Sequence, residues 1–203
     1  MIAIIDYKAG NVKSVERALR HLGVACRITN SPAKIISSEG VIFPGVGAAG
    51  KTMEVIRSLN LDSVIHEVVR QKIPFLGICL GSQIILKVSE EDDASCLNLI
   101  AGTVRRFPDM GIKIPHMGWN NISIEQRHPI LSGIDREAQF YFVHSYYPEP
   151  QHREHIIATT HYGIPFASVI GRNNIVATQF HPEKSGRFGL HLLKNFTEWN
   201  GTC

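Results

Sequence analysis

The stretch Pro74-Phe75-Leu76-Gly77-Ile78-Cys79-Leu80-Gly81-Ser82-Gln83 places a cysteine between an apolar run and a helical pattern. Residues 74–78 predict a buried strand, and residues 83–88 predict a helix. The intervening Gly-x-Cys-x-Gly has the layout of a nucleophile elbow, in which glycines permit a sharp turn and the apical side chain stands above the sheet. A helix N-terminus behind Cys79 favours the thiolate. Taken alone, the stretch also fits a small buried cysteine beside a packed helix.

Size and composition restrict the kind of protein. A chain of 203 residues is long enough for one domain with a good core, so we expect residues 1–203 to form a single domain. A hydrophobic content of 44% and a charged content of 19% are typical of soluble globular proteins. The net charge of +3 and the absence of a basic stripe argue against nucleic-acid binding.

The cysteines and the first residues indicate the compartment. Cys26, Cys79, Cys96 and Cys203 lack the close spacing of a zinc site or a disulfide framework. The apolar start at residues 1–6 is too short for a signal peptide, and no run reaches the length of a membrane span. We therefore expect a cytoplasmic protein with reduced thiols, no metal and no cofactor.

In the first half of the chain, strand and helix patterns alternate. This alternation predicts a flavodoxin-like, doubly wound, mostly parallel sheet with helices on both faces. The predicted strands are 2–5, 24–28, 40–43 and 74–78, and the predicted helices are 11–22, a short one from Ser31-Pro32, 50–59 and 61–72. Sites in such sheets lie off the carboxyl ends of the strands, where Cys79 and Pro44-Gly45-Val46-Gly47 fall.

The second half of the chain is rich in strand patterns. They predict antiparallel strands added to the sheet, together with a small side layer. The candidates are 103–107, 121–125, 139–143, 156–160, 166–170 and 175–179, and a last helix is expected at 185–199. The polar segment 89–95 predicts a mobile loop.

Partners for a catalytic thiolate follow other predicted strands. In extended chain, residues two apart point the same way, so His181 and Glu183 of Gln179-Phe180-His181-Pro182-Glu183 can share one side. A carboxylate there would orient the imidazole and stabilise its charged form. Gly45 and Gly47 free the backbone to aim N–H groups at a developing oxyanion. Each pattern alone also fits an ordinary turn, but their common position at strand ends favours a site.

Together these motifs resemble the class I (triad) glutamine amidotransferases nearly end to end. The opening Asp6-Tyr7, Gly10-Asn11 and Ser14-Val15, and the later Phe142-Val143-His144-Ser145-Tyr146, are similar to that class. His116-Met117-Gly118-Trp119-Asn120 is more diagnostic, and is similar to glutaminase subunits that serve a separate cyclase. The class I fold is therefore the expected fold.

The resemblance implies that Cys79 attacks the side-chain amide of glutamine, with His181 as base and Glu183 orienting it. Ammonia would leave, and water would hydrolyse the γ-glutamyl thioester. The residues implied for the oxyanion hole are Gly45, Val46, Gly47 and Leu80, and those implied to bind glutamine are Gln83, Ser145 and Tyr146.

The resemblance also implies a partner. Trp119, Tyr141 and Lys184 match positions that face a cyclase of the (β/α)8-barrel type in a heterodimer. Ammonia would pass through that barrel to form imidazole glycerol phosphate in histidine biosynthesis. Paralogues that supply ammonia for sugar amidation are an alternative, as is a catalytically silent regulatory subunit on the same fold. A cysteine hydrolase acting on peptides is a further alternative.

Two positions depart from the family pattern. Ser82 stands where the family usually has Met, beside the expected nucleophile. Cys96-Leu97-Asn98 replaces the usual Gly-Leu-Gly in a region that the resemblance places at the border of the glutamine pocket.

Overall fold

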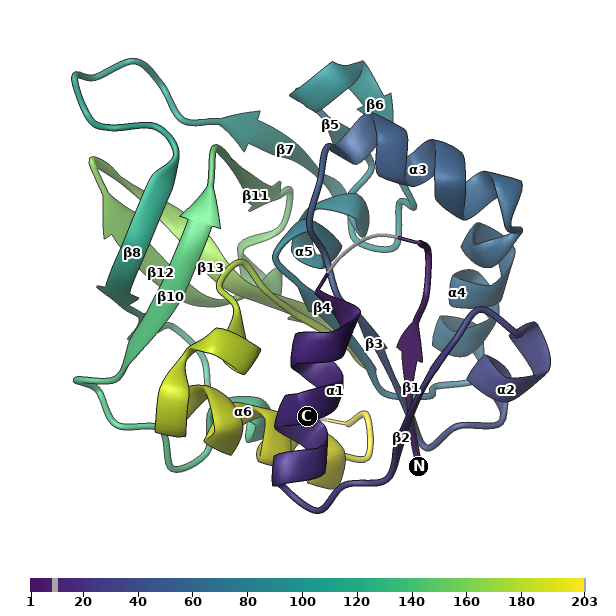
Figure 1. The fold of residues 1–203 in the computed structure, drawn as a ribbon. Helices are drawn as coiled ribbons and strands as arrows, with labels where there is room; N and C mark the ends of the chain where they lie inside the picture. The colour runs from purple at the N-terminus through teal and green to yellow at the C-terminus, as the bar shows by residue number, and fades with distance from the viewer. Residues whose placement is uncertain (9–10, 203) are drawn as a thin grey trace.

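The computed structural model describes residues 1–8 and 11–202, so Gly10 of the opening motif and Cys203 lie outside the described residues. An eight-stranded sheet, ordered β2-β1-β3-β4-β14-β13-β12-β9, runs through the molecule (Figure 1). The first five strands are parallel and the last three antiparallel. In that order, the strands are β2 Cys26–Thr29, β1 Ile2–Ile5, β3 Gly40–Phe43, β4 Phe75–Ile78, β14 Ile175–Thr178, β13 Ile164–Arg172, β12 Ile156–Tyr162 and β9 Ser123–Ile124.

Helices cover both faces of the parallel part, because its central strands β1, β3 and β4 are apolar on both sides. Ile2 and Ile4 of β1 join one core cluster, whereas Ala3 and Ile5 join the other. The first cluster contains α1 (Val12–His21) and α6 (Gly186–Glu198). The second contains α2 (Pro32–Ile36), α3 (Ala49–Ser58), α4 (Leu61–Arg70) and α5 (Leu80–Ile84). Burying each large aliphatic side chain contributes about 1.5–3 kcal/mol, so two clusters hold the helices firmly.

Two small sheets lie beside the main one. β8 (His116–Asn121) and β10 (Gln139–His144) form an antiparallel pair. A second sheet has the order β11-β7-β5-β6, with β11 Tyr146–Pro150, β7 Gly102–Arg106, β5 Val88–Ser89 and β6 Ala94–Ser95. Short 3-10 turns occupy Glu91–Asp93, Pro129–Leu131, Arg153–His155 and Pro182–Lys184. None of the helices in 1–8 and 11–202 is long and apolar enough to cross a bilayer.

The predicted doubly wound sheet with antiparallel additions is confirmed, but two strands were not predicted and two local predictions are wrong. The sequence did not predict β8, because two of its apolar side chains, Met117 and Trp119, are exposed to solvent. It did not predict β11 either, because this strand contains two prolines, which are tolerated only because β11 lies at the edge of its sheet. Helix α5 covers Leu80–Ile84 instead of the predicted 83–88. Glycine disfavours a helix, but Gly81 packs so closely against β3 that the helix includes it. Residues 89–95, which the sequence predicted to be a mobile loop, instead form a short hairpin around a 3-10 turn.

Candidate active site

Cys79 sits at the turn between β4 and α5 in a strained conformation. Its φ of 52° and ψ of −105° lie outside the regions that L-residues ordinarily adopt. Hydrogen bonds hold the residue there: its N–H donates to the Thr178 carbonyl at 2.7 Å, and its carbonyl accepts from the Ser82 hydroxyl at 2.7 Å. The sulfur therefore has a fixed position at the carboxyl end of the strand, as the elbow pattern predicts.

The two elbow glycines are required by packing as well as by the turn. A Cβ on Gly77 would lie 2.6 Å from the Gly81 carbonyl oxygen. A Cβ on Gly81 would lie 2.7 Å from the Phe43 carbonyl oxygen. The elbow can thus contact β3 only because neither residue carries a side chain.

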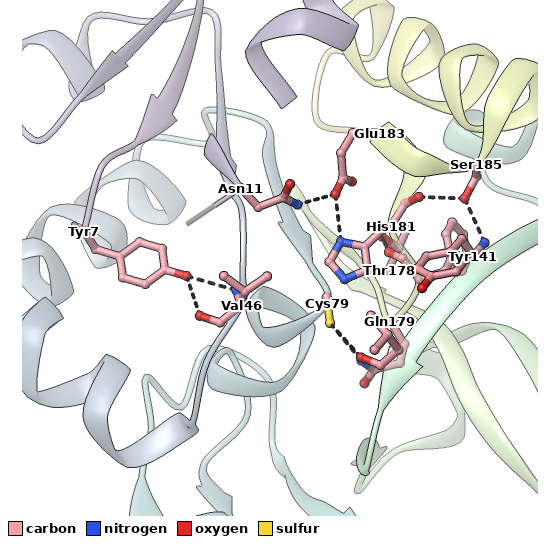
Figure 2. Close-up of polar contacts among 12 residues, drawn as sticks. Tyr7, Asn11, Val46, Cys79, Tyr141, Thr178, Gln179, His181, Glu183 and Ser185 are labelled. Carbon is pink, nitrogen blue, oxygen red and sulfur yellow. Dashed lines mark hydrogen bonds and ion pairs between the residues drawn. The ribbon is translucent and has the colours of Figure 1, made fainter. Parts of the chain in front are cut away.

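His181 and Glu183 lie over the sulfur, on the turn after β14. His181 Nδ1 and Glu183 Oε1 are 2.7 Å apart, and both side chains are fully buried. Figure 2 shows the imidazole between the carboxylate and the Cys79 sulfur, with Nε2 on the sulfur side. That nitrogen has no hydrogen-bond partner among the described residues. The ring is therefore placed to exchange a proton with the thiol.

The charges around His181 favour its protonated form. Burial acts against that form, but the Cys79 sulfur and the Glu183 carboxylate outweigh it and raise the pKa of His181 to about 10. A charged imidazole at neutral pH is the natural partner of a thiolate. The structure therefore places a charged imidazole beside the Cys79 sulfur.

Further residues hold the pair in place. Asn11 donates its amide to Glu183 Oε1 (Figure 2). The His181 N–H donates to the Tyr141 carbonyl at 2.9 Å, and the Ser185 hydroxyl donates to the His181 carbonyl at 2.6 Å. Sequence reasoning gave Asn11 and Ser185 no role, because their spacing from Glu183 and His181 reveals no contact until the fold is known.

A cavity of about 350 Å³ opens over the sulfur. This volume suits a small molecule of amino-acid size better than an extended peptide. The residues around it include most of those expected at the site: Val46, Gly47, Cys79, Leu80, Gln83, Ser145, Tyr146 and His181. Gly45 and Glu183 are not among the residues around the cavity.

Glu91 also lines the cavity, and sequence reasoning missed it because it lies in the supposed loop. Its carboxylate accepts the Ala49 N–H at 2.7 Å, at the start of α3. Burial raises the pKa of this carboxyl group. It is the one acidic side chain among the cavity-lining residues that the structure describes, so it can attract a ligand's ammonium group.

The turn 44–47 passes between Tyr7 and the elbow. A Cβ on Gly45 would lie 2.6 Å from both the Gly81 nitrogen and the Leu80 Cβ, so this backbone touches the elbow directly. Val46 N–H donates to the Tyr7 hydroxyl at 3.2 Å. Gly47 has a φ of +115°, which glycine adopts readily. Leu80 opens helix α5, whose first N–H groups have no intrahelical acceptor.

Gln83 belongs to a polar network in the cavity wall. Its amide donates to the Tyr146 carbonyl at 2.9 Å and to Gln179 Oε1 at 3.0 Å. The Gln179 amide in turn reaches the Cys79 sulfur at 3.7 Å. The side-chain NH2 group of Gln83 thus donates both of its hydrogen bonds within the protein, which leaves the side-chain oxygen to accept from a ligand.

A chain of buried histidines extends this network to β8. His144 Nδ1 lies 2.8 Å from the Tyr146 carbonyl and must donate to it, so His144 Nε2 accepts from His116 Nδ1 at 3.0 Å. The Asn120 amide lies 3.3 Å from the remaining nitrogen of His116. Burial lowers the pKa of His116 to about 4 and that of His144 to about 3, so both rings are neutral.

The three expected partner-facing residues lie together on the surface. Trp119 of β8 pairs with Tyr141 of β10, with ring centroids 6.1 Å apart. Lys184 Nζ lies 5.9 Å from the centre of the Tyr141 ring. Trp119 is 53% exposed and its strand neighbour Met117 is 57% exposed. This aromatic surface cluster, Trp119, Tyr141 and Lys184, is an apolar patch with one cation.

The departures from the family pattern have local explanations. The buried Ser82 hydroxyl bonds the Cys79 carbonyl. Asn98 has a φ of +53°, a conformation that asparagine tolerates better than most residues, so it can stand in place of glycine. Cys96 and Asn98 are not among the residues around the cavity, so the expected border with the glutamine pocket is not seen.

Hydrolysis of an amide through a thioester needs a fixed thiolate, a proton donor and an anion-binding turn, and this cavity brings such groups together. These three features, placed at the strand ends of a doubly wound sheet, are those of the triad amidotransferases. The chain belongs to the glutamine amidotransferase class-I family, whose match covers residues 3–199.

Relatives of the chain within this family carry a more specific name. The chain is 52% identical to imidazole glycerol phosphate synthase subunit HisH of Desulfovibrio desulfuricans, over 98% of this chain and 94% of the relative. It is 48% identical to the HisH subunit of Dehalococcoides mccartyi, over 97% and 96% of the two chains.

Solved structures share the fold. PurLQS from Thermotoga maritima matches with a TM-score of 0.78 at 15% identity, over 97% of both chains. The glutaminase domain of CTPS from Trypanosoma brucei matches with a TM-score of 0.66 at 15% identity, over 100% of this chain and 97% of that one.

Proposed function

We propose that the chain is the glutaminase subunit of an imidazole glycerol phosphate synthase. The observation that carries this proposal is the buried Cys79–His181–Glu183 arrangement over an amino-acid-sized cavity. About 50% identity over nearly the full length to subunits named HisH supports the choice among amidotransferases. The chain would act as one domain, residues 1–203, in the cytoplasm.

In the first half-reaction, the Cys79 thiolate attacks the side-chain carbonyl carbon of glutamine. The carbon–sulfur bond forms, and the carbonyl oxygen becomes an oxyanion that N–H groups of Leu80 and the turn 45–47 stabilise. His181 then gives its proton to the leaving nitrogen, and the carbon–nitrogen bond breaks to release ammonia. Glu183 keeps the imidazole oriented throughout.

In the second half-reaction, water attacks the γ-glutamyl thioester. His181, now neutral, accepts a proton from the water, and glutamate leaves as the Cys79 thiolate returns. We assign the amino-acid end of the substrate to the far side of the cavity. There Glu91 would pair with the ammonium group, and Gln83, Ser145 and Tyr146 would bind the rest.

The ammonia acceptor would be a separate HisF-like cyclase of the (β/α)8-barrel type, bound as a heterodimer. The aromatic surface cluster supports this, because an exposed tryptophan beside a half-buried tyrosine and a cation is a typical anchor of protein interfaces. A tight coupling would prevent glutamine hydrolysis without an acceptor.

The test is glutamate formation by the purified chain, measured alone and with a histidine-pathway cyclase and its nucleotide ligand. We expect slow hydrolysis alone and strong stimulation by the cyclase. Hydrolysis without any response to the cyclase would contradict the proposed partner and favour the sugar-amidation alternative. No hydrolysis under any condition would contradict the glutaminase assignment and favour a silent subunit.

A further inference from the structure

Gln179 is a fully buried glutamine to which the proposed function gives no role. It follows β14, where Thr178 pairs with Ile78 of β4. The next residues along these two strands, Gln179 and Cys79, are therefore neighbours at the carboxyl edge of the sheet. The Gln179 N–H donates to the Ser168 carbonyl at 2.9 Å, which holds its backbone in place. The side chain thus starts from a fixed point beside the nucleophile.

The hydrogen-bond network determines which end of the Gln179 amide faces the sulfur. The Tyr146 backbone carbonyl can only accept, so the Gln83 group that lies 2.9 Å from it is the NH2 group. This NH2 group lies 3.0 Å from one end of the Gln179 amide, which must therefore be the oxygen. The other end, 3.7 Å from the Cys79 sulfur, is then the NH2 group. Gln179 is thus a hydrogen-bond donor to the sulfur.

The sulfur needs donors, because the thiolate and not the thiol is the nucleophile. The Val143 carbonyl oxygen, 3.9 Å away, can accept a proton from the thiol but has no hydrogen to offer a sulfur anion. Figure 2 shows Gln179 and His181 beside the Cys79 sulfur in different directions. A hydrogen bond to the charged form of a group favours that form. The amide of Gln179 is therefore placed to stabilise the charged nucleophile.

We propose that Gln179 is a catalytic residue whose side-chain amide donates to the Cys79 sulfur and favours its charged form. This inference rests on the proposed glutaminase function. Unlike His181, which gives its proton to the leaving nitrogen, a neutral amide keeps its hydrogens through both half-reactions. Because Gln83 holds the other end of the same amide, two hydrogen bonds join the nucleophile to the glutamine-binding wall.

The variant Gln179→Met tests this role, because it keeps an unbranched side chain of similar length and removes the donor. The native chain is alkylated with iodoacetamide at a series of pH values. Mass spectrometry then quantifies the tryptic peptide 73–87, which contains Cys79 and no other cysteine. One net hydrogen bond is worth about three- to tenfold in an equilibrium, so the midpoint of this pH profile should rise by about 0.5–1 unit.

Turnover in the complex with the cyclase gives a second readout of the same variant. Below the midpoint, kcat should fall about two- to fourfold, because a sulfur without the donor is rarer in its charged form but more nucleophilic. KM for glutamine should stay within about twofold, because Gln83 keeps its bond to the Tyr146 carbonyl. A raised KM with unchanged kcat would overturn the proposal, since Gln179 would then act only through Gln83.

The matched control is Gln126→Met, the same exchange at a glutamine outside the cavity-lining residues. The amide of Gln126 donates to backbone carbonyls, among them that of Ile156 at 2.7 Å. This control should change neither the alkylation midpoint nor kcat. A folded Gln179→Met protein with the wild-type midpoint would overturn the proposal. The other titratable side chains around the sulfur are kept in both variants: His181 with its partner Glu183, His144, Glu91 and Tyr7.

A third measurement uses the wild-type chain, so it does not depend on how Gln179→Met folds. The side-chain amide signal of Gln179 in NMR should shift as the pH passes through the alkylation midpoint, and it should not shift there in Cys79→Ser. A signal that stays constant in the wild type would refute the proposal. If the complex does not hydrolyse glutamine, the proposed function fails, and the alkylation and NMR profiles still decide whether Gln179 donates to the sulfur.

Discussion

Cys79 gains its reactivity from position: the strained backbone fixes the sulfur, and the buried imidazole lies over it. Replacing it by serine keeps the shape but provides an oxygen that is a far weaker nucleophile beside the same base. We expect Cys79→Ser to lower glutamate formation by at least about a thousandfold. Thermal unfolding should stay within about 2 °C of the wild-type midpoint, which shows that the loss is chemical. Residual turnover near the wild-type rate would remove Cys79 from its role.

At His181, the neighbouring negative charges determine the protonation state. With a pKa raised to about 10, the imidazole is charged below that pH and loses its proton only as the pH rises through it. Glu183→Gln removes one of these charges, so the pKa of His181 should fall and the proton should leave at lower pH. NMR titration of histidine side chains, with His181→Gln for assignment, measures this. A wild-type His181 that titrates near the ordinary value of about 6.5 would contradict the ion pair.

At the scale of elements, the site depends on how closely β3 and the elbow approach each other. Gly45→Ala puts a Cβ against backbone at 2.6 Å, and such overpacking costs about 1–3 kcal/mol. We expect a lower free energy of unfolding in urea and a lower glutaminase rate. Gly40→Ala, at the start of the strand that precedes this turn, meets only the tips of Ile2 and Phe196 and should cost less than half as much. Equal costs would show that close approach at Gly45 is unimportant.

The hairpin of β5 and β6 brings Glu91 into the cavity wall. A charged pair with the substrate ammonium is worth about 1.5–3 kcal/mol, so Glu91→Gln should raise KM for glutamine at least about tenfold. The amide oxygen can still accept the Ala49 N–H, which keeps α3 in place. Glu90→Gln is the control, because Glu90 bonds Arg105 on the surface. Steady-state kinetics that show the same KM for both variants would exclude Glu91 from binding.

Local sequence patterns predicted the regular elements and failed where tertiary contacts decide the structure. The apolar runs of β1, β3 and β4 are unambiguous, because strands buried on both faces carry no polar residues. The sequence pattern did not predict β11, because Pro148 and Pro150 disfavour a strand. The strand forms because it pairs with β7 at the edge of the sheet. The Cys79, His181 and Glu183 motif was visible from its residue types. The contacts of Asn11 with Glu183 and of Tyr7 with Val46 could not be predicted, because each joins residues that are far apart in sequence.

At the scale of the whole molecule, strand β8 carries part of the aromatic surface cluster and also one end of a polar network that reaches the cavity wall. β8 carries Trp119 on the surface, and its buried His116 leads through His144 to the Tyr146 carbonyl in the cavity wall. The sequence motif at 116–120 predicted the exposed tryptophan by resemblance only. The buried histidine chain could not be predicted, because it needs the pairing of β8 with β10.

The cluster leads to a prediction about assembly. Truncating a central interface tryptophan typically costs at least about 2 kcal/mol, which is roughly 30-fold in Kd. We expect Trp119→Ala to weaken binding to the cyclase by about that factor in titration calorimetry. Ile124→Ala removes another exposed apolar side chain outside the cluster and should leave Kd unchanged. Equal effects of the two variants would argue against an anchor at Trp119.

The pairing of β4 with β14 has a consequence for the order of events during synthesis. Val176 lies opposite Leu76, so the strand that carries the base joins the elbow strand across about a hundred residues of chain. A ribosome that adds about 5–20 residues each second completes the elbow many seconds before His181 emerges. During that interval Cys79 has neither imidazole nor carboxylate beside it. The nascent protein therefore acquires its reactive sulfur only as its last strand docks.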